Sequence, residues 1–295
     1  MSTLAILLVV ISAVMHATWN SIGKRSATSA AFFIWATALG TLLFSPLLLP
    51  HWRDILELPA SFWWLLFISG GFQALYLAGL AKAYTKADLS LVYPLARSTP
   101  VMLVPVLVWL IYSRSALSGL DLIAMLFIVV GALILPLTRW SAWKLSNYFN
   151  AGVGWALVAA FGTAGYSVID SAAILNMRAL GWEPFAAGST FVVLQGVSIV
   201  AWMLPILKWG FRESVALPKQ LKPTLLAGTF IMLTYLLVLV SMSMVEEVSY
   251  VVALRQLSIP IGVAIGALWL REKLSLPRIQ GVSLMLIGLV LVSSS

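Results

Sequence analysis

The chain has 295 residues, of which 61% are apolar and only 9% are charged, and its mean hydropathy is +1.01. Soluble domains carry about 25% charged residues, so this composition excludes a soluble enzyme. The net charge is +8, but the basic residues lie singly or in small groups between apolar runs. That distribution favours contact with lipid headgroups over nucleic-acid binding. Cysteine is absent, which excludes disulfides and thiol chemistry.

Ten apolar segments follow one another along the chain, each long and uniformly apolar enough to predict a membrane-spanning helix. The first lacks the basic region and cleavage site of a signal peptide, so it is expected to remain as a membrane helix. The segments are Leu4–Ile22, Ala31–Leu49, Phe62–Ala83, Leu89–Ile111, Leu120–Leu137, Val153–Leu175, Phe185–Leu207, Leu225–Met244, Val248–Leu270 and Ile279–Val292. This pattern predicts an all-α, multi-pass protein of the inner cell membrane.

The two halves of the chain resemble each other. The longest connection, 138–152, combines aromatic and basic residues in the manner of a membrane interface and separates residues 1–140 from residues 150–295. Matches between the halves recur in the same order at nearly constant offset: Ser90–Leu95 with Ser249–Leu254, Tyr76 with Tyr235, Leu117-Ser118 with Leu274-Ser275, Gly131 with Gly288, and Ala17–Asn20 with Ala164–Ser167. Five segments per half is an odd number, so the second copy is predicted to enter the membrane from the opposite side.

A more specific resemblance lies at the end of segment nine. The run Leu268-Trp-Leu-Arg-Glu-Lys-Leu-Ser275, followed by a helix with Gly281 and Gly288, resembles the drug/metabolite transporter superfamily in its EamA-type branch. In that family a glutamate commonly follows helix nine, as Glu272 does here. The first half departs from this pattern, because it has Ser113-Arg114-Ser115 at the corresponding place. The resemblance implies ten transmembrane helices in two five-helix inverted repeats around a central cavity. Members of the family export amino acids and other metabolites, and related branches exchange phosphorylated compounds.

Two arginines lie deep inside predicted membrane helices. Arg97 and Arg255 occupy nearly equivalent places in the two repeats, each roughly 12–13 Å from its helix end. A charge at the centre of a spanning helix costs about 2.5–3.5 kcal/mol on insertion scales. Such residues are therefore expected to face a hydrated cavity, where they bind a ligand, or to have a structural partner. The structural alternatives are a pair with Asp170 and a hydrogen bond to a carbonyl freed by proline.

The same two segments carry prolines, namely Pro94, Pro100, Pro105 and Pro260. Proline removes a backbone donor and frees the carbonyl about one turn earlier. Helix breaks at membrane depth are tolerated where they are buried in protein or line a cavity. Segments four and nine are therefore predicted to be broken beside the binding site.

Polar and aromatic side chains form matching stripes on segments one and six. His16, Trp19 and Asn20 share one helix face, as do Tyr166 and Asp170. His16 and Asp170 are candidates for proton coupling, although a membrane histidine is also a common packing residue. The other candidates for the substrate site are Trp19, Asn20, Tyr76, Tyr93, Tyr166, Tyr235, Tyr250 and Gln256. For each tyrosine, interfacial anchoring is the alternative.

Motifs for other chemistry are missing from the sequence. No G-x-x-x-x-G-K-[ST] phosphate loop, H-E-x-x-H pair or G-x-S-x-G elbow occurs. We therefore expect no bound cofactor, no catalytic metal and no enzymatic activity.

The orientation in the membrane is predicted differently by two criteria. Of the 18 basic residues, Arg97 and Arg255 lie inside segments, and Arg53, Arg114 and Arg178 lie in loops on the side of the termini. The remaining thirteen lie on the other side. The positive-inside rule therefore predicts that both termini lie outside the cytoplasm, whereas the family resemblance implies that both are cytoplasmic.

These features predict a secondary-active carrier that moves a small polar or amphipathic metabolite, anionic or zwitterionic, by alternating access, as an exporter or exchanger. Its expected partners are the substrate, protons and the lipid bilayer, with no nucleic acid and no obligate protein partner. The alternative is a non-transporting receptor or assembly protein. A third reading, an intramembrane lipid-modifying enzyme, has only Glu246-Glu247 in its favour.

Overall fold

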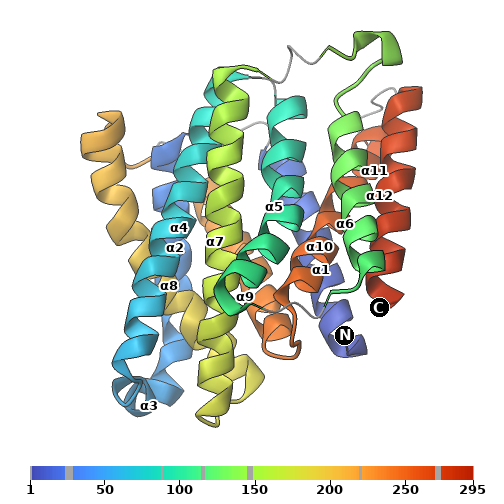
Figure 1. Cartoon of the computed structure of the whole chain (residues 1–295). Coiled ribbons are helices and arrows are strands. Elements are labelled where there is room, and N and C mark those ends of the chain that lie inside the picture. The colour runs from blue at the N-terminus through green and yellow to red at the C-terminus, as the bar shows by residue number, and fades with distance from the viewer. Residues whose placement is uncertain are drawn as a thin grey trace.

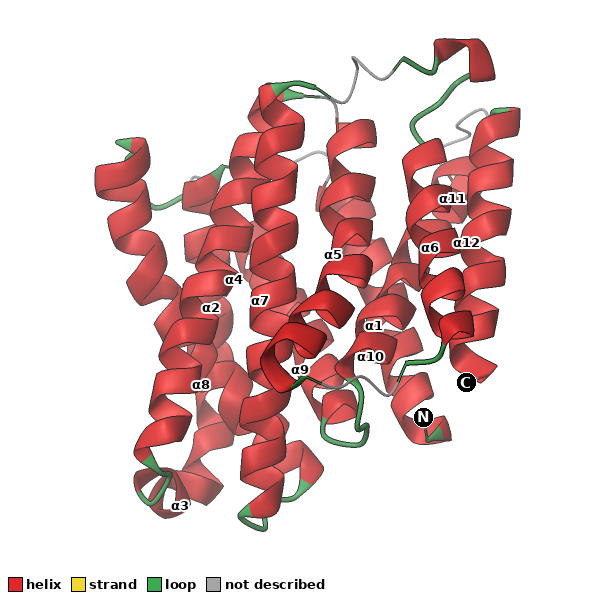
Figure 2. Ribbon diagram, in the orientation of Figure 1, coloured by secondary structure: helices red, strands yellow, loops and turns green. Residues whose placement is uncertain are grey.

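The computed structural model describes residues 2–23, 29–87, 89–113, 117–144, 149–218, 221–269 and 274–294. The side chains of residues 18–23, 89, 90, 269 and 294 are outside this description. The described chain is a helical bundle without strands (Figures 1 and 2). Its two ends lie at the same side of the bundle (Figure 1).

The first half of the chain forms α1 (Thr3–Gly23), α2 (Ala30–Phe44), η1 (Ser45–His51), α3 (Trp52–Leu56), α4 (Ala60–Lys86), α5 (Leu89–Tyr112), α6 (Gly119–Ile134) and η2 (Trp140–Ala142). The second half forms α7 (Ala151–Ala179), α8 (Pro184–Pro205), η4 (Ile206–Phe211), α9 (Leu221–Met242), α10 (Val248–Leu254), η5 (Arg255–Leu257), α11 (Ser258–Trp269) and α12 (Leu276–Ser294).

Eight helical stretches of the described chain are long and apolar enough to cross a membrane, beginning at Ala30, Ala60, Leu91, Ala151, Pro184, Leu221, Val248 and Leu276. Two more apolar stretches, Thr3–Ala17 and Gly119–Ile134, are shorter. Each of the ten predicted segments falls on one of these stretches. The prediction of an all-helical, multi-pass membrane protein is confirmed at this level.

Polar residues at helix starts explain where several helices begin. Ser29 and Asn150 accept hydrogen bonds from backbone N–H groups in the first turns of α2 and α7. Ser118 and Asp121 form a reciprocal capping box at the start of α6. Because backbone donors left free at a helix start must find partners, these side chains determine where the adjoining loops end.

The most extensive helix contacts join the two halves of the chain. Helix α4 packs on α7, α1 on α9, α2 on α9, α4 on α8, and α6 on α12. Figure 1 shows α6 and α12 side by side at one edge of the bundle. The halves therefore interdigitate and do not form two separate domains.

Small residues allow the backbones of α6 and α12 to approach closely. A Cβ atom on Gly131 would lie 2.6 Å from the carbonyl oxygen of Gly281, and one on Gly288 would lie 2.5 Å from that of Ala124. Helix association in membranes depends on such packing because lipid tails are as apolar as the side chains. The order of these contacts along the chain makes the two helices antiparallel.

We expect Gly131→Ala to destabilise the protein by about 1–3 kcal/mol. The added methyl group would meet backbone atoms of α12, which cannot move without shifting the helix. The measurement is thermal unfolding in detergent. Gly154→Ala is the control, because no atom lies within 4 Å of its added Cβ, and it is expected to be neutral or slightly stabilising. Equal melting temperatures for the two variants would contradict the close packing of α6 and α12.

Candidate functional site

A small cavity lies between α1, α5, α9 and η5. It contains about 240 Å³ of empty space, its mouth included. In this conformation the cavity has room for about one water molecule. Its lining consists of Ser12, Ala13, His16, Arg97, Thr234, Tyr235, Val238 and Arg255. Arg97, Arg255 and His16, all named as candidates from the sequence, therefore meet at one place.

Arg97 is hydrogen-bonded to protein through one guanidinium nitrogen, while another of its nitrogens has no partner. The side chain is only 7% exposed. Its Nη2 atom donates to the backbone oxygen of Arg255 at 3.3 Å and to Oγ of Ser258 at 3.0 Å. Its Nε atom is buried without a hydrogen-bond partner. Because an unsatisfied buried donor costs about 1–3 kcal/mol or more when charged, this donor is suited to an acceptor that enters the cavity.

The carbonyl that Arg97 binds lies where segment nine is broken. The α-helix stops after Leu254, a 3₁₀ turn covers Arg255–Leu257, and α11 begins at Ser258. Pro260 lacks the N–H group that would continue the helical hydrogen bonds across this point. The predicted break beside the site is therefore confirmed for segment nine. The carbonyl that Arg97 binds is not the one that Pro260 frees, because the missing N–H of Pro260 would bond the Gln256 oxygen, whereas the Arg255 oxygen also accepts a hydrogen bond from Ser258.

The predicted break in segment four is wrong. Helix α5 runs without interruption from Leu89 to Tyr112 through Pro94, Pro100 and Pro105. The φ angle that the proline ring imposes is close to the helical value, and neighbouring helices in a bundle can accommodate the missing hydrogen bonds. Arg97 consequently projects from a continuous helix.

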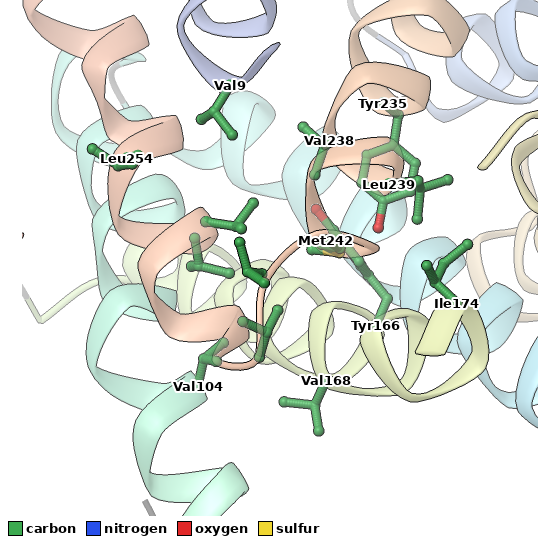
Figure 3. Close-up of a cluster of buried hydrophobic side chains, with 14 of the residues drawn as sticks. Val9, Val104, Tyr166, Val168, Ile174, Tyr235, Val238, Leu239, Met242 and Leu254 are labelled. Atoms are coloured by element: carbon green, nitrogen blue, oxygen red, sulfur yellow. The ribbon is translucent and has the colours of Figure 1, made fainter. Parts of the chain in front are cut away.

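Arg255 lies against a row of tyrosines. Its Cζ atom is 5.4 Å from the centre of the Tyr235 ring. The rings of Tyr76, Tyr166 and Tyr235 follow one another edge to face, with centroid separations of 6.0 and 5.6 Å. Figure 3 shows Tyr166 of α7 and Tyr235 of α9 beside buried aliphatic side chains of the core. Three predicted aromatic residues therefore form one wall that ends at Arg255.

Asp170 is the centre of a buried hydrogen-bond network that joins four helices. Ser69 of α4 donates to its Oδ1 atom. Gln195 of α8, at 2.8 Å, and Tyr235 of α9 donate to its Oδ2 atom. Gln195 also donates to Ser69 at 2.6 Å and accepts a hydrogen bond from Gln73 at 3.0 Å. A buried carboxylate needs such donors to offset its lost hydration.

The alternative of a direct ion pair between Asp170 and a membrane arginine is not what the structure contains. The ion pairs within the described residues are Lys82–Glu213, His51–Asp54 and Arg178–Glu183. Between Asp170 and Arg255 lies Tyr235, whose hydroxyl binds the carboxylate and whose ring lies under the guanidinium. Asp170 therefore supports the cavity from behind this ring.

Other predicted site residues lie elsewhere. The Tyr250 hydroxyl donates to Asp121 at 3.2 Å, near the start of α6, and Gln256 donates to the Val252 oxygen at 2.9 Å. Neither lines the cavity. Tyr93 is half-buried on α5 and also lies outside the lining. The side chains of Trp19 and Asn20, and residues 270–273 of the run after segment nine, are outside the described residues.

Sequence reasoning missed several residues that shape the site, namely Ser12, Ser69, Gln195 and Ser258. The Ser12 hydroxyl donates to the Thr234 oxygen at 2.8 Å and so joins α1 to α9 within the lining. The signal in the sequence was a single polar residue in an apolar helix. Such a residue is predicted to be buried against protein, but the sequence does not predict which residue it contacts.

Glu247, the residue that would favour an enzyme, is 7% exposed and caps a helix start. Its Oε1 atom accepts hydrogen bonds from the backbone nitrogen and the hydroxyl of Ser249, at 3.2 and 2.7 Å. In the described part of the chain, no group of three or more His, Asp or Glu side chains is placed to hold a metal ion.

Comparison with known proteins identifies the fold alone. No family model matches the sequence, and no curated protein matches it. A solved structure described only as "Crystal structure of protein" is similar over 98% of this chain and 97% of its own, with a TM-score of 0.70 and 14% sequence identity. The whole chain therefore has a helical fold found in at least one other protein.

Proposed function

We propose that this protein is a ten-helix secondary carrier of the inner membrane, built as two inverted five-helix repeats like those of EamA-type drug/metabolite transporters. It moves a small polar or amphipathic anion or zwitterion by alternating access, as an exporter or exchanger. In this proposal α1 and α6 also cross the membrane, and α10, η5 and α11 form one broken crossing.

The helix contacts support the inverted repeat. In an inverted repeat, α1, α2, α4 and α5 of the first half correspond to α7, α8, α9 and α11 of the second. The α4–α7 contact then has the α9–α1 contact as its counterpart, and the α2–α9 contact has the α8–α4 contact. The α5–α7 contact likewise corresponds to the α11–α1 contact, and all six contacts occur. At the offset of 157 that pairs Gly131 with Gly288, Ala124 pairs with Gly281. The two close approaches of α6 and α12 exchange under the same operation. A pseudo-two-fold axis in the membrane plane would produce this pattern.

The observation that carries the proposed substrate class is the placement of two guanidiniums in one cavity lining that contains no carboxylate among its described residues. Intramembrane charges that face a cavity mark substrate or ion pathways. The small volume of the cavity corresponds to a closed conformation, from which the two halves open alternately to either face of the membrane.

Cysteine accessibility tests this function, because the 295-residue sequence contains no cysteine of its own. Val238 lines the cavity and is 1% exposed. We expect Val238→Cys in sealed vesicles to react with a small membrane-impermeant thiol reagent added from either face, because alternating access exposes the cavity to each side in turn.

Val168→Cys is the matched control. Val168 is 4% exposed in the core and lies outside the cavity lining, so its cysteine is expected not to react from either face. A Val238 cysteine that stays unreactive from both faces would favour a packed scaffold such as a receptor or assembly protein. Reaction from one face only would contradict alternating access.

A further inference from the structure

Beyond the general class of substrate, the lining discriminates between kinds of anion. We propose that the cavity selects an organic anion without an ammonium group beside its acidic group, such as a hydroxy acid or a phosphate ester, and rejects the corresponding amino compound. This inference rests on the proposed function and narrows it, since a transporter of anions or zwitterions could accept both.

The positive charges of the site are available to a ligand. Arg97 is more than nine-tenths buried, lines the cavity and has an Nε donor without a partner. Arg255 lines the same cavity and rests on the Tyr235 ring. Guanidinium groups form strong charge-assisted hydrogen bonds with carboxylate and phosphate oxygens. The acidic group of the ligand is therefore placed between these two side chains.

An ammonium group on the same ligand would have no counter-charge. Asp170 is the one acidic residue more than a helical turn inside any of the ten apolar segments. It is 0% exposed, and both of its oxygens accept hydrogen bonds from protein donors. Tyr235 separates it from the cavity. An ammonium group in the cavity would therefore meet two guanidiniums at low dielectric constant, and the described residues of the lining offer it no carboxylate.

A neutral hydroxyl suits the same position. The Ser12 hydroxyl donates its proton to the Thr234 oxygen, and the Thr234 hydroxyl donates to the Phe230 oxygen at 2.6 Å. Because both protons are used, the hydroxyl oxygens of these two cavity-lining residues can act only as hydrogen-bond acceptors toward a ligand. A ligand hydroxyl can donate to them without bringing a second charge into the site.

Two matched pairs of compounds test the inference with the wild-type protein. Phenyllactate and phenylalanine differ only in a hydroxyl against an ammonium group, and so do 2-hydroxyethyl phosphate and phosphoethanolamine. The measurement is the dissociation constant of each compound from thermal stabilisation, followed by uptake into vesicles. We expect the hydroxyl member of at least one pair to bind at least about tenfold more tightly than its ammonium partner. The pair that responds distinguishes a carboxylate from a phosphate ligand.

Equal or tighter binding of the ammonium members would overturn this inference and leave the proposed carrier function standing. Binding of none of the four compounds would overturn the inference and count against the proposed function as well.

Removal of the Tyr235 ring supplies a second readout. Tyr235→Ala is expected to open Asp170 to the cavity. The dissociation constants of the hydroxyl and ammonium members of a pair should then differ by less than about threefold. Tyr250→Ala is the matched control, because Tyr250 also donates to a carboxylate but lies outside the lining, and the wild-type preference should persist. An unchanged preference in Tyr235→Ala would contradict the assignment of Tyr235 as the residue that shields Asp170.

Discussion

Replacing Arg255 by glutamine is expected to lower transport of phenyllactate and 2-hydroxyethyl phosphate by roughly a hundredfold. Loss of one partner in a buried, hydrogen-bonded charge interaction costs about 2–5 kcal/mol, and each 1.4 kcal/mol corresponds to a factor of ten. Arg255 lines the cavity and lies over the Tyr235 ring, so its charge acts inside the cavity. The measurement is the initial rate of uptake into vesicles, with the melting temperature recorded in parallel.

Arg178→Gln is the control for this substitution. Arg178 lies at the end of α7 and binds the Trp182 backbone oxygen, outside the cavity lining, so its loss should change uptake by less than about twofold. If Arg255→Gln transports both compounds as fast as Arg178→Gln does, the guanidinium has no role in binding the anion.

Asp170→Ala is expected to cause the largest loss of stability. The substitution leaves the donors of Ser69, Gln195 and Tyr235 without their acceptor, at an expected cost of about 3–5 kcal/mol. The melting temperature should fall by on the order of 10 °C. Because the network joins α4, α7, α8 and α9, limited proteolysis should show that all four helices loosen together.

The comparison variant is Asp54→Ala, which removes a carboxylate whose side chain is 60% exposed in α3. Its expected change in the free energy of unfolding is within about 0.5 kcal/mol. A melting temperature for Asp170→Ala that matches Asp54→Ala would show that the network does not hold the bundle together.

Much of the fold could be predicted from composition alone. Uniformly apolar runs that cross a bilayer are expected to be helices, because a helix satisfies its own backbone groups in hydrocarbon and a barrel strand would alternate polar and apolar residues, and every predicted segment falls on helical structure. The depth of Arg97 and Arg255 was equally informative. A charge at the centre of an apolar helix must find a polar place, and the structure brings both arginines to one cavity with His16 and Tyr235.

The remaining features of the site depend on contacts between helices, which the sequence of one helix does not specify. Ser69 and Gln195 matter because they meet Asp170, and nothing in their own segments names that partner. Tyr250 was assigned to the site from its place near Arg255 in the chain, but its direction on the helix takes it to Asp121. The prolines of α5 were expected to break the helix. Packing against neighbouring helices decides whether a proline breaks a helix or only removes one hydrogen bond from a continuous helix.

The most direct test of the positively charged, hydrated cavity needs no knowledge of the substrate. Val238→Cys would be treated with two methanethiosulfonate reagents, the anionic sulfonatoethyl and the cationic trimethylammonioethyl forms, and each rate divided by that for free mercaptoethanol. The account predicts that the anionic reagent reacts at least about tenfold faster, and that adding Arg255→Gln removes most of this preference. A cationic reagent that reacts equally fast or faster would contradict the account.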